Sequence, residues 1–259
     1  MELLKRGRME EIGSSRDDYL DSLLEPMELY LEMLGKDASP YEVRSEGKEL
    51  AYAVADDNGV LYEFHVLHEN LTWAREIFQK VLKDLSIRKA YCQSFDHLYL
   101  SMCMIHSGER RVIGHCFRER RITEAPEIEL EERTAVIEDL DLIIKNREEI
   151  FEDNEVADIP FYINKGSIRI FETADGDFIG YGLINRTIPG RDWFDIGMYV
   201  HPDHRKRGYG TYILHRMMDI CDRNGWRPVA GCSIENEPSR RTLEKAGLIS
   251  RYVMLEFEF

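Results

Sequence analysis

The chain has 259 residues, of which 43% are hydrophobic and 32% are charged, and its formal net charge at pH 7 is −15. This length suits one large domain or two ordinary ones, and the acidic balance argues against nucleic acids and anionic membranes as partners. No apolar run approaches the roughly 18 residues of a membrane span, and residues 1–16 are too charged for a secretory signal. We therefore expect a soluble, cytoplasmic protein.

The cysteine pattern predicts buried, reduced thiols. The cysteines contain no C-x-x-C pair and their number is odd, which argues against a zinc site and against a disulfide framework. Each lies in an apolar segment, as structural thiols do. The five residues are Cys92, Cys103, Cys116, Cys221 and Cys232. We expect no bound metal.

Helix and strand patterns alternate through the first 120 residues. Residues 15–34 have a capping-box-like start and an apolar helical stripe that Pro26 interrupts. Asp57-Asn58-Gly59 separates two segments with strand patterns, which is a strong hairpin signal. After the hairpin, the patterns predict a helix, a strand, a helix and a strand, at 71–85, 87–92, 96–105 and 111–118.

The remaining residues begin with an acidic stretch and then alternate again. Apolar residues in 134–151 follow a helical spacing, and the acidic surroundings are explained either as a solvated helix face or as a means of attracting a cationic amine. The later patterns predict three strands, a helix, a strand, a helix ending at Gly247 and a closing strand. The predicted ranges are 168–173, 177–185, 193–200, 211–221, 227–234, 236–247 and 251–259.

The loop Arg205-Lys206-Arg207-Gly208-Tyr209-Gly210 connects a predicted strand to a predicted helix. Glycines allow the backbone to approach an anion closely, and the helix N-terminus and the cations add positive charge. The loop lacks the Gly-Lys-Ser/Thr ending of a P-loop and the G-x-G-x-x-G pattern of a dinucleotide fold. It therefore predicts a site for a different phosphorylated ligand.

The same loop resembles Gln/Arg-x-x-Gly-x-Gly/Ala, the acyl-CoA signature of the GNAT superfamily of N-acetyltransferases. Residues 234–248 resemble a second motif of that family, an Asn-x-x-Ser/Ala helix that ends in Lys-x-Gly-Phe. Asn236 and Ser239 stand at the two motif positions, and Lys245 and Gly247 stand at its end. The two motifs occur in the family order.

This resemblance implies an α/β fold of the α+β kind, in which helices flank a mixed, mostly antiparallel sheet. We expect residues 121–259 to form the acetyltransferase domain. The element order of residues 1–120 repeats that of the C-terminal half, which predicts an internal duplication and a tandem of two GNAT-like domains. Because His68 to Thr72 offer neither glycine nor cation, we expect a degenerate first domain that shapes or covers the active cleft; an unrelated α/β accessory domain is the alternative.

The resemblance further implies acetyl transfer from acetyl-CoA to a primary amine of a small molecule or peptide. Backbone groups of Met198 and Val200 would pair with the pantetheine arm, and Arg205 would open the signature. The backbone from Arg207 to Thr211 would hold the pyrophosphate, with Asn236 on the pantetheine or thiol end. The complete set of predicted coenzyme-binding residues is Met198, Val200, Arg205, Lys206, Arg207, Gly208, Tyr209, Gly210, Thr211, Asn236 and Ser239.

The residues that would move protons depart from the family pattern. Leu243 stands seven residues after Asn236, where many members have a tyrosine acid, and Gly231 stands five residues before it, where a glutamate base is frequent. The predicted catalytic candidates are instead Asp195, Glu235 and Tyr252, with Glu172, Tyr199 and Tyr209 as further possibilities. The departures leave two alternatives open, a non-catalytic acyl-CoA sensor and a protein-interaction module on an old enzyme fold.

Overall fold

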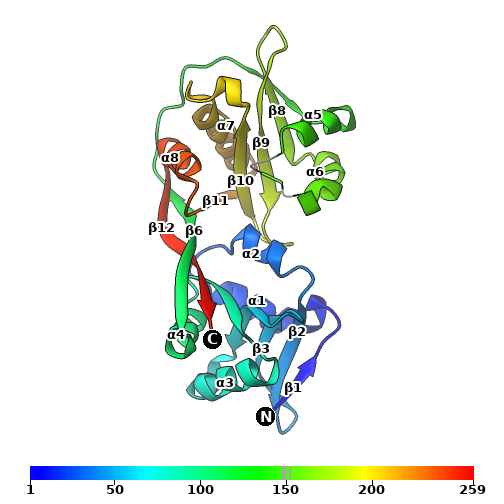
Figure 1. Cartoon of the computed structure of the whole chain (residues 1–259), viewed down its shortest axis with the longest axis vertical. Coiled ribbons are helices and arrows are strands. Elements are labelled where there is room, and N and C mark those ends of the chain that lie inside the picture. Colours follow the sequence, from blue (N-terminus) through cyan, green and yellow to red (C-terminus); the bar gives the residue numbers. More distant parts are fainter. Residues whose placement is uncertain (148–149, 152) are drawn as a thin grey trace. The chain divides into compact units, whose positions relative to one another are not determined.

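The computed structural model describes residues 1–147, 150–151 and 153–259 (Figure 1). The chain divides into two compact units, neither of which is continuous in sequence. Unit 1 contains residues 1–118, 231–236 and 250–259, and unit 2 contains residues 119–230 and 237–249. Three strands therefore contribute residues to both units, namely β6 (Glu109–Arg120), β11 (Arg227–Ser233) and β12 (Leu248–Glu258).

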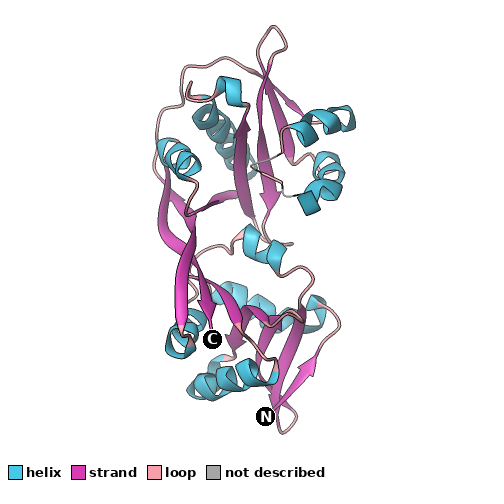
Figure 2. Cartoon of the chain, viewed as in Figure 1, coloured by secondary structure: helices cyan, strands magenta, loops and turns pink. Residues whose placement is uncertain are grey.

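Unit 1 is built on a sheet with strand order β1-β2-β3-β4-β5-β12-β6. Strands β4 and β5 run parallel, whereas β1 with β2, β2 with β3, β3 with β4 and β5 with β12 are antiparallel. Helices flank the strands (Figure 2). The elements not yet given bounds are β1 (Glu2–Lys5), η1 (Met9–Ile12), α1 (Gly13–Ser22), α2 (Leu29–Leu34), β2 (Ser39–Ser45), β3 (Lys48–Ala55), β4 (Val60–Val66), η2 (His68–Trp73), α3 (Ala74–Asp84), β5 (Lys89–Gln93) and α4 (His97–His106).

Aromatic side chains from α3, α4 and β4 form the centre of the unit 1 core. The ring of Phe64 lies 4.8 Å from that of Phe78, and Tyr99 packs 6.3 Å from both. Helix α3 reaches this core through one face, because its buried residues recur at helical spacing. The predicted hairpin is confirmed, and Gly59 at its turn has a positive φ of 77°.

Unit 2 contains strands in the order β11-β10-β9-β8-β7, of which only β10 and β11 pair in parallel among the described residues. Its core includes Ile143, Ile159, Ile170, Tyr181 and Tyr199. The fold class is thus confirmed as helices flanking mixed, mostly antiparallel sheet. The remaining elements are β7 (Glu131–Thr134), η3 (Ile137–Asp139), α5 (Leu140–Lys145), η4 (Asp153–Asp158), α6 (Ile159–Asn164), β8 (Ile168–Glu172), β9 (Phe178–Arg186), β10 (Trp193–Val200), η5 (Pro202–His204), α7 (Tyr209–Asn224) and α8 (Glu237–Lys245).

The single helix predicted over 134–151 is wrong. Thr134 ends strand β7, and a 3₁₀ turn precedes the short helix α5; residues 148 and 149 of the predicted helix lie outside the described residues. The carboxylate of Asp139 explains the break, because its Oδ2 accepts a hydrogen bond from the amide of Val136 at 2.8 Å. This local bond competes with a helix that would pass through Val136.

Both halves of the chain follow the same element order. A hairpin, a helix, a strand, a helix and a strand appear as β3-β4-α3-β5-α4-β6 and again as β9-β10-α7-β11-α8-β12. The predicted repetition of elements is therefore present in the structure. Sequence patterning missed β1, β2, β7 and α6.

Candidate functional site

The loop between β10 and α7 adopts a conformation suited to an anion. Gly208 is the N-cap residue of α7, with φ 90° and ψ −8°, a left-handed conformation that L side chains rarely adopt. Lys206 is also left-handed, with φ 62°. Alternation of left-handed and right-handed residues turns successive backbone N–H groups toward one point.

The first turn of α7 has backbone N–H groups without an acceptor in the helix. The amide of Tyr212 donates to the carbonyl of Gly208 at 3.0 Å, which makes it the first intrahelical hydrogen bond. The N–H groups of residues 209–211 therefore have no acceptor within the helix. Glycine has no side chain with which to cap them, and the 16-residue helix places its positive end at the same point.

Gly210 is needed for packing rather than for backbone conformation. A Cβ atom on Gly210 would lie 3.0 Å from Cγ2 of Thr242 on α8 and 3.6 Å from Cγ2 of Val200 on β10. Absence of that atom lets the first turn of α7 approach both elements closely. Gly208 thus provides a left-handed backbone conformation, whereas Gly210 provides space for close packing.

The cations of the loop differ in their surroundings. Arg205 turns back onto the strand, because its Nε donates to the carbonyl of Val200 at 3.0 Å and its guanidinium lies 5.9 Å from the ring centre of Tyr199. All three cations are exposed, and Lys206 and Arg207 follow Arg205 toward the start of α7. Arg205 therefore braces the loop, while the other two can meet a ligand.

Strand β10 offers main-chain groups on the side away from β9. The amide of His201 donates to the carbonyl of Ile179 at 2.9 Å, so the antiparallel ladder bonds residue 201 and every second residue before it to β9. Met198 and Val200 fall between these positions and direct their N–H and C=O groups to the opposite side. Over the described residues, the parallel ladder with β11 pairs only Trp193–Asp195 with Arg227–Val229. An extended ligand can therefore pair with β10 beyond Asp195.

The predicted residues do not all belong to one unit. Met198, Val200 and the loop residues 205–211 lie together in unit 2, as does Ser239 in the first turn of α8. Glu235 and Asn236 belong to unit 1, in the turn after β11, where their amides bond to Ser233 at 3.3 and 3.0 Å.

The three predicted catalytic side chains have distinct environments. Asp195 is half-buried on β10 at the last position of the parallel ladder, opposite Val229. Glu235 is exposed, in the turn before α8. Tyr252 is half-buried on β12, and its ring lies 5.4 Å from that of Phe95.

Two of the further possibilities have structural partners. The buried hydroxyl of Tyr199 donates to Oδ1 of Asn146 at 3.0 Å, and Glu172 accepts from Nε of Arg133 at 3.0 Å. Leu243 is 2% exposed and belongs to the core of α8. These contacts favour structural roles for Tyr199, Glu172 and Leu243.

Sequence reasoning missed Glu28, which lies against Gly231. A Cβ atom on Gly231 would stand only 2.2 Å from Oε1 of Glu28 and 2.9 Å from its Cδ. Glu28 is 5% exposed, and its Oε2 accepts from Nη2 of Arg118. A carboxylate from the segment between α1 and α2 therefore occupies the space that a side chain at residue 231 would enter. Burial of an acidic residue so far away in the chain leaves no local pattern.

The N-terminal repeat has a corresponding strand edge on β4, beyond Leu61. The amide of Leu67 bonds to the carbonyl of Leu50, so Phe64 and Val66 direct their main-chain groups away from β3. Strand β4 pairs with β5 only at Val60 and Leu61 over the described residues. The hydroxyl of Tyr99 donates to the carbonyl of Leu61 at 2.9 Å, and its ring packs in the aromatic core.

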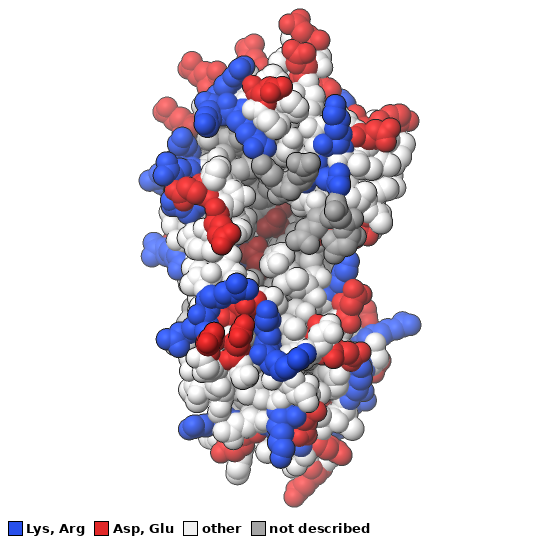
Figure 3. Space-filling view, viewed as in Figure 1, with Lys and Arg blue, Asp and Glu red and all other residues white. Residues whose placement is uncertain are grey.

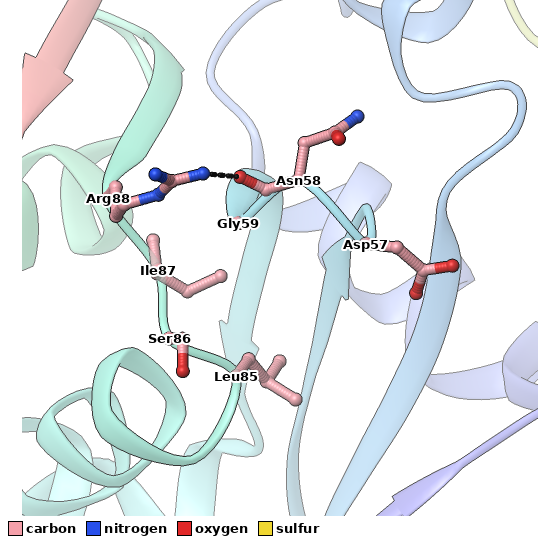
Figure 4. A pocket seen from close by; sticks show the side chains of 7 residues that line it. All are labelled: Asp57, Asn58, Gly59, Leu85, Ser86, Ile87 and Arg88. Atoms are coloured by element: carbon pink, nitrogen blue, oxygen red, sulfur yellow. Dashed lines mark hydrogen bonds between the residues drawn. The ribbon is translucent and has the colours of Figure 1, made fainter.

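A hollow of about 460 Å³ lies elsewhere in unit 1, at the β3–β4 turn (Figure 4). Its edge includes Arg88, whose Nη2 donates to the carbonyl of Asn58 at 3.0 Å. This is the end of β4 opposite to η2, and the lining contains none of the predicted site residues. The seven lining residues are Asp57, Asn58, Gly59, Leu85, Ser86, Ile87 and Arg88.

On the face in view and among the described residues, charge and metal geometry indicate no competing site. On the face shown in Figure 3, Lys and Arg side chains are interspersed with Asp and Glu, as on an ordinary solvated surface. Among residues 1–147, 150–151 and 153–259, no group of three His, Cys, Asp or Glu side chains is placed to hold a metal ion. Within the same part of the chain, no helix combines the length and the apolar character needed to cross a membrane. Four cysteines are buried, and Cys232 is partly exposed.

Two family models match the chain, one in each half. "Acetyltransferase (GNAT) domain" matches residues 8–120, and "Acetyltransferase (GNAT) family" matches residues 123–248. No curated protein matches the sequence.

Solved structures with the same fold align with nearly the whole chain. A GNAT-family acetyltransferase from Colwellia psychrerythraea has a TM-score of 0.89 at 15% identity, with 100% of both chains covered. A GCN5-related N-acetyltransferase from Sphaerobacter thermophilus has a TM-score of 0.61 at 16% identity, covering 99% of this chain and 95% of the other. A tandem GNAT protein from the clavulanic acid biosynthesis pathway has a TM-score of 0.58 at 12% identity, covering 99% and 98%. The predicted tandem of two GNAT-like domains is confirmed.

Proposed function

Because the chain belongs to the GNAT acetyltransferase family, with a GNAT domain in each half, we propose that it transfers the acetyl group of acetyl-CoA to a primary amine. The C-terminal domain, residues 121–259, would carry the reaction, and residues 1–120 would form a degenerate companion domain. The observation that carries this proposal is the left-handed Gly208 at the N-terminus of α7, beside the open edge of β10.

The proposed coenzyme site uses mainly main-chain groups. Amides from Arg207 through Thr211 would bind the pyrophosphate, with Lys206 and Arg207 adding positive charge and Arg205 bracing the loop. Main-chain groups of Met198 and Val200 would pair with the pantetheine arm. Asn236 would bind the pantetheine or the thiol end, and Ser239 would complete the set from the first turn of α8.

The chemistry requires an amine nitrogen to attack the thioester carbonyl carbon. The carbonyl oxygen gains negative charge as the C–N bond forms, and the amide of Met198 or Val200 on the strand edge would stabilise it. One such fixed donor contributes roughly 3–4 kcal/mol to lowering the barrier. The C–S bond then breaks, and the coenzyme leaves as a thiol.

The reaction also requires a proton acceptor for the amine and an acid for the leaving thiol. An alkylamine has a pKa of about 10 and must lose a proton before it attacks, whereas a thiol with a pKa of about 8.5 leaves readily. Asp195 and Glu235 are the proposed proton acceptors, and Tyr252 is the proposed acid for the leaving thiol. All three are partly or fully exposed.

A second function, acyl-CoA binding without catalysis, is favoured by one observation. Leu243 is buried where the family motif often has a tyrosine acid, so this position supplies no proton to the leaving thiol. A protein of this kind would keep the coenzyme site and report on the acyl-CoA supply.

One experiment separates the two functions. Release of free thiol from acetyl-CoA is measured against a panel of peptide N-termini, lysine, polyamines, aminoglycosides and amino acids, and thermal stabilisation by acetyl-CoA is measured in parallel. Amine-dependent thiol release supports the transferase. Stabilisation without thiol release supports the sensor, and the absence of both contradicts the coenzyme site itself.

A further inference from the structure

Residues 121–130, the strap, connect β6 to β7 and contact the coenzyme loop, residues 205–211. The place of the missing Cβ of Gly208 lies 3.4 Å from Cδ1 of Ile128 and 3.8 Å from Cβ of Pro126. Pro126 and Ile128 are half-buried, and the amide of Ile128 donates to the carbonyl of Pro126 at 2.9 Å. This tight turn presents two apolar side chains to the glycine that precedes α7. The strap and the coenzyme loop both belong to unit 2.

The first end of the strap is bonded to the end of α8 and to the middle of α7. The amide of Arg121 donates to the carbonyl of Gly247 at 2.8 Å. The hydroxyl of Thr123 donates to the carbonyl of Ala246 at 3.0 Å and lies 3.3 Å from Nε2 of His215 on α7. Gly247 has a φ of 97°, and a Cβ atom on it would collide with the carbonyl oxygen of Arg121. The glycine of the second family motif therefore makes room for the strap.

The second end of the strap returns to the middle of α7. Strand β7 begins directly after the strap and pairs with β8. Within β7, Oε2 of Glu132 accepts from Nε of Arg216 on α7 at 2.9 Å. His215 and Arg216 are neighbours, so both ends of the strap are held at one level of the helix, whereas Ile128 contacts Gly208, about two turns away. The tip of the strap therefore lies at the coenzyme loop.

The coenzyme loop has a conformation that its own side chains do little to support. Lys206 is left-handed, with φ 62°, which is costly for a residue with a side chain and persists only where the surroundings hold it. Lys206 and Arg207 are exposed, so neither side chain is packed in place. Arg205 braces the loop before this point, through the carbonyl of Val200. After it, the strap contacts Gly208.

We propose that the strap positions the coenzyme loop, with Ile128 as the positioning residue, a role that rests on the coenzyme site proposed above. Packing of Ile128 on Gly208 keeps the start of α7 in place, so the N–H groups of residues 209–211 stay directed outward before the coenzyme arrives. The diphosphate then binds donors that are already ordered, and ordering the loop takes nothing from its affinity. Ile128 itself needs no contact with the coenzyme.

The test measures binding of acetyl-CoA to full-length Ile128→Ala by isothermal titration calorimetry. If the freed loop is competent for binding about a tenth of the time, the apparent Kd rises about tenfold, and this is the expected result. Ile122→Ala is the matched control and should keep the wild-type Kd, because Ile122 lies on the same strap and is fully exposed. Ile128→Leu retains an apolar side chain of the same volume and should bind within about threefold of wild type.

Hydrogen exchange of the protein without ligand gives a second measurement. The amide of Tyr212, whose bond to Gly208 closes the first turn of α7, should exchange faster in Ile128→Ala than in wild type or in Ile122→Ala. The amide of Ile184 in β9, which donates to the carbonyl of Ser167, should exchange at the wild-type rate. If Ile128→Ala folds poorly, Pro126→Gly loosens the same turn and should give both results.

The outcomes separate the role of the strap from the coenzyme site. If wild type binds acetyl-CoA and folded Ile128→Ala binds it within about twofold of wild type, the strap does not position the loop and the coenzyme site stands. Weaker binding with unchanged exchange at Tyr212, or equal weakening in Ile122→Ala, also overturns the positioning role. If wild type fails to bind acetyl-CoA, the coenzyme site fails and the role of the strap fails with it.

Discussion

The carbonyl of Gly208 accepts the first hydrogen bond of helix α7, from the amide of Tyr212 at 3.0 Å. This bond fixes where the helix begins, and it leaves the N–H groups of residues 209–211 directed outward. Gly208 is left-handed at this point, and Cδ1 of Ile128 lies 3.4 Å from the place of its missing Cβ. The proposed binding of a diphosphate at this point would therefore depend on the backbone, and substitutions test the proposal through their effect on the backbone conformation.

Substitution of Gly208 by glutamate should abolish acetyl-CoA binding. The new side chain adds bulk and negative charge at the proposed pyrophosphate position, and we expect affinity to fall by at least about 100-fold, or roughly 3 kcal/mol. Isothermal titration calorimetry measures the change. Gly190→Glu is the matched control, because Gly190 also has a positive φ and nothing lies within 4 Å of its missing Cβ. Equal loss of affinity in both variants would contradict the site.

Substitution of Gly210 by valine should destabilise the protein. Its Cβ would meet Cγ2 of Thr242 at 3.0 Å, and overpacking of this kind costs about 1–3 kcal/mol. Urea unfolding measures the loss. Adding Thr242→Ser removes the opposing methyl group and should recover part of the stability. No recovery in the double variant would show that α8 is not the element crowded by the new side chain.

The stability of the protein should depend on pH through Asp96. Burial raises the pKa of the Asp96 carboxyl to about 7 from its ordinary 3.8, and the carboxyl accepts hydrogen bonds from Tyr19 and from the amide of Tyr99. Between pH 4 and 7 the folded state therefore binds more protons than the unfolded state, so stability falls as pH rises.

Asp96→Asn should remove this contribution. The free energy of unfolding of the variant, relative to wild type, should increase from pH 4.5 to 7, by at most about 4 kcal/mol at about 1.4 kcal/mol per pKa unit, and stay constant above that. Urea unfolding at a series of pH values measures the difference. Asp37→Asn, at an exposed position, should give a curve parallel to wild type; parallel curves for Asp96→Asn would contradict the prediction.

Restoring a tyrosine at residue 243 should not restore a proton donor. Leu243 is 2% exposed, so a larger polar side chain would be forced into the core at a cost of about 1–3 kcal/mol. We expect Leu243→Tyr to lower the melting temperature without raising kcat, whereas Leu243→Met, which conserves volume, should be nearly neutral. A rise in kcat for Leu243→Tyr would place this residue in the active site instead.

Local rules were enough to predict the hairpin and the strand–loop–helix conformation around residues 205–211. Asp57-Asn58-Gly59 requires a tight turn, and the cation–glycine loop lies between a strand pattern and a helix pattern, so each conformation is encoded within a few residues. The same holds for Gly208, because glycine permits the positive φ that this position has. These features depend little on contacts from far along the chain.

Features that depend on contacts between residues far apart in the sequence were not predicted. The apolar spacing of 134–151 resembles a helix, yet Asp139 binds the amide of Val136 and starts a different turn. Glu28 follows a break between two helices, and only the folded chain brings it to Gly231. The glycine there was interpreted as a missing catalytic group, because sequence alone does not show which side chain fills the space.

The pairing of β12 with β5 has a consequence for how the protein is made. Met254 lies beside Gln93 in the sheet of unit 1, and this pairing continues to Glu258 and Lys89. During synthesis, β5 emerges long before β12 does, so β5 stays an uncovered edge until residues 248–258 have been made. The amino-terminal sheet therefore depends on residues that come much later in the sequence, and a truncation before Ser250 would leave β5 without this neighbour.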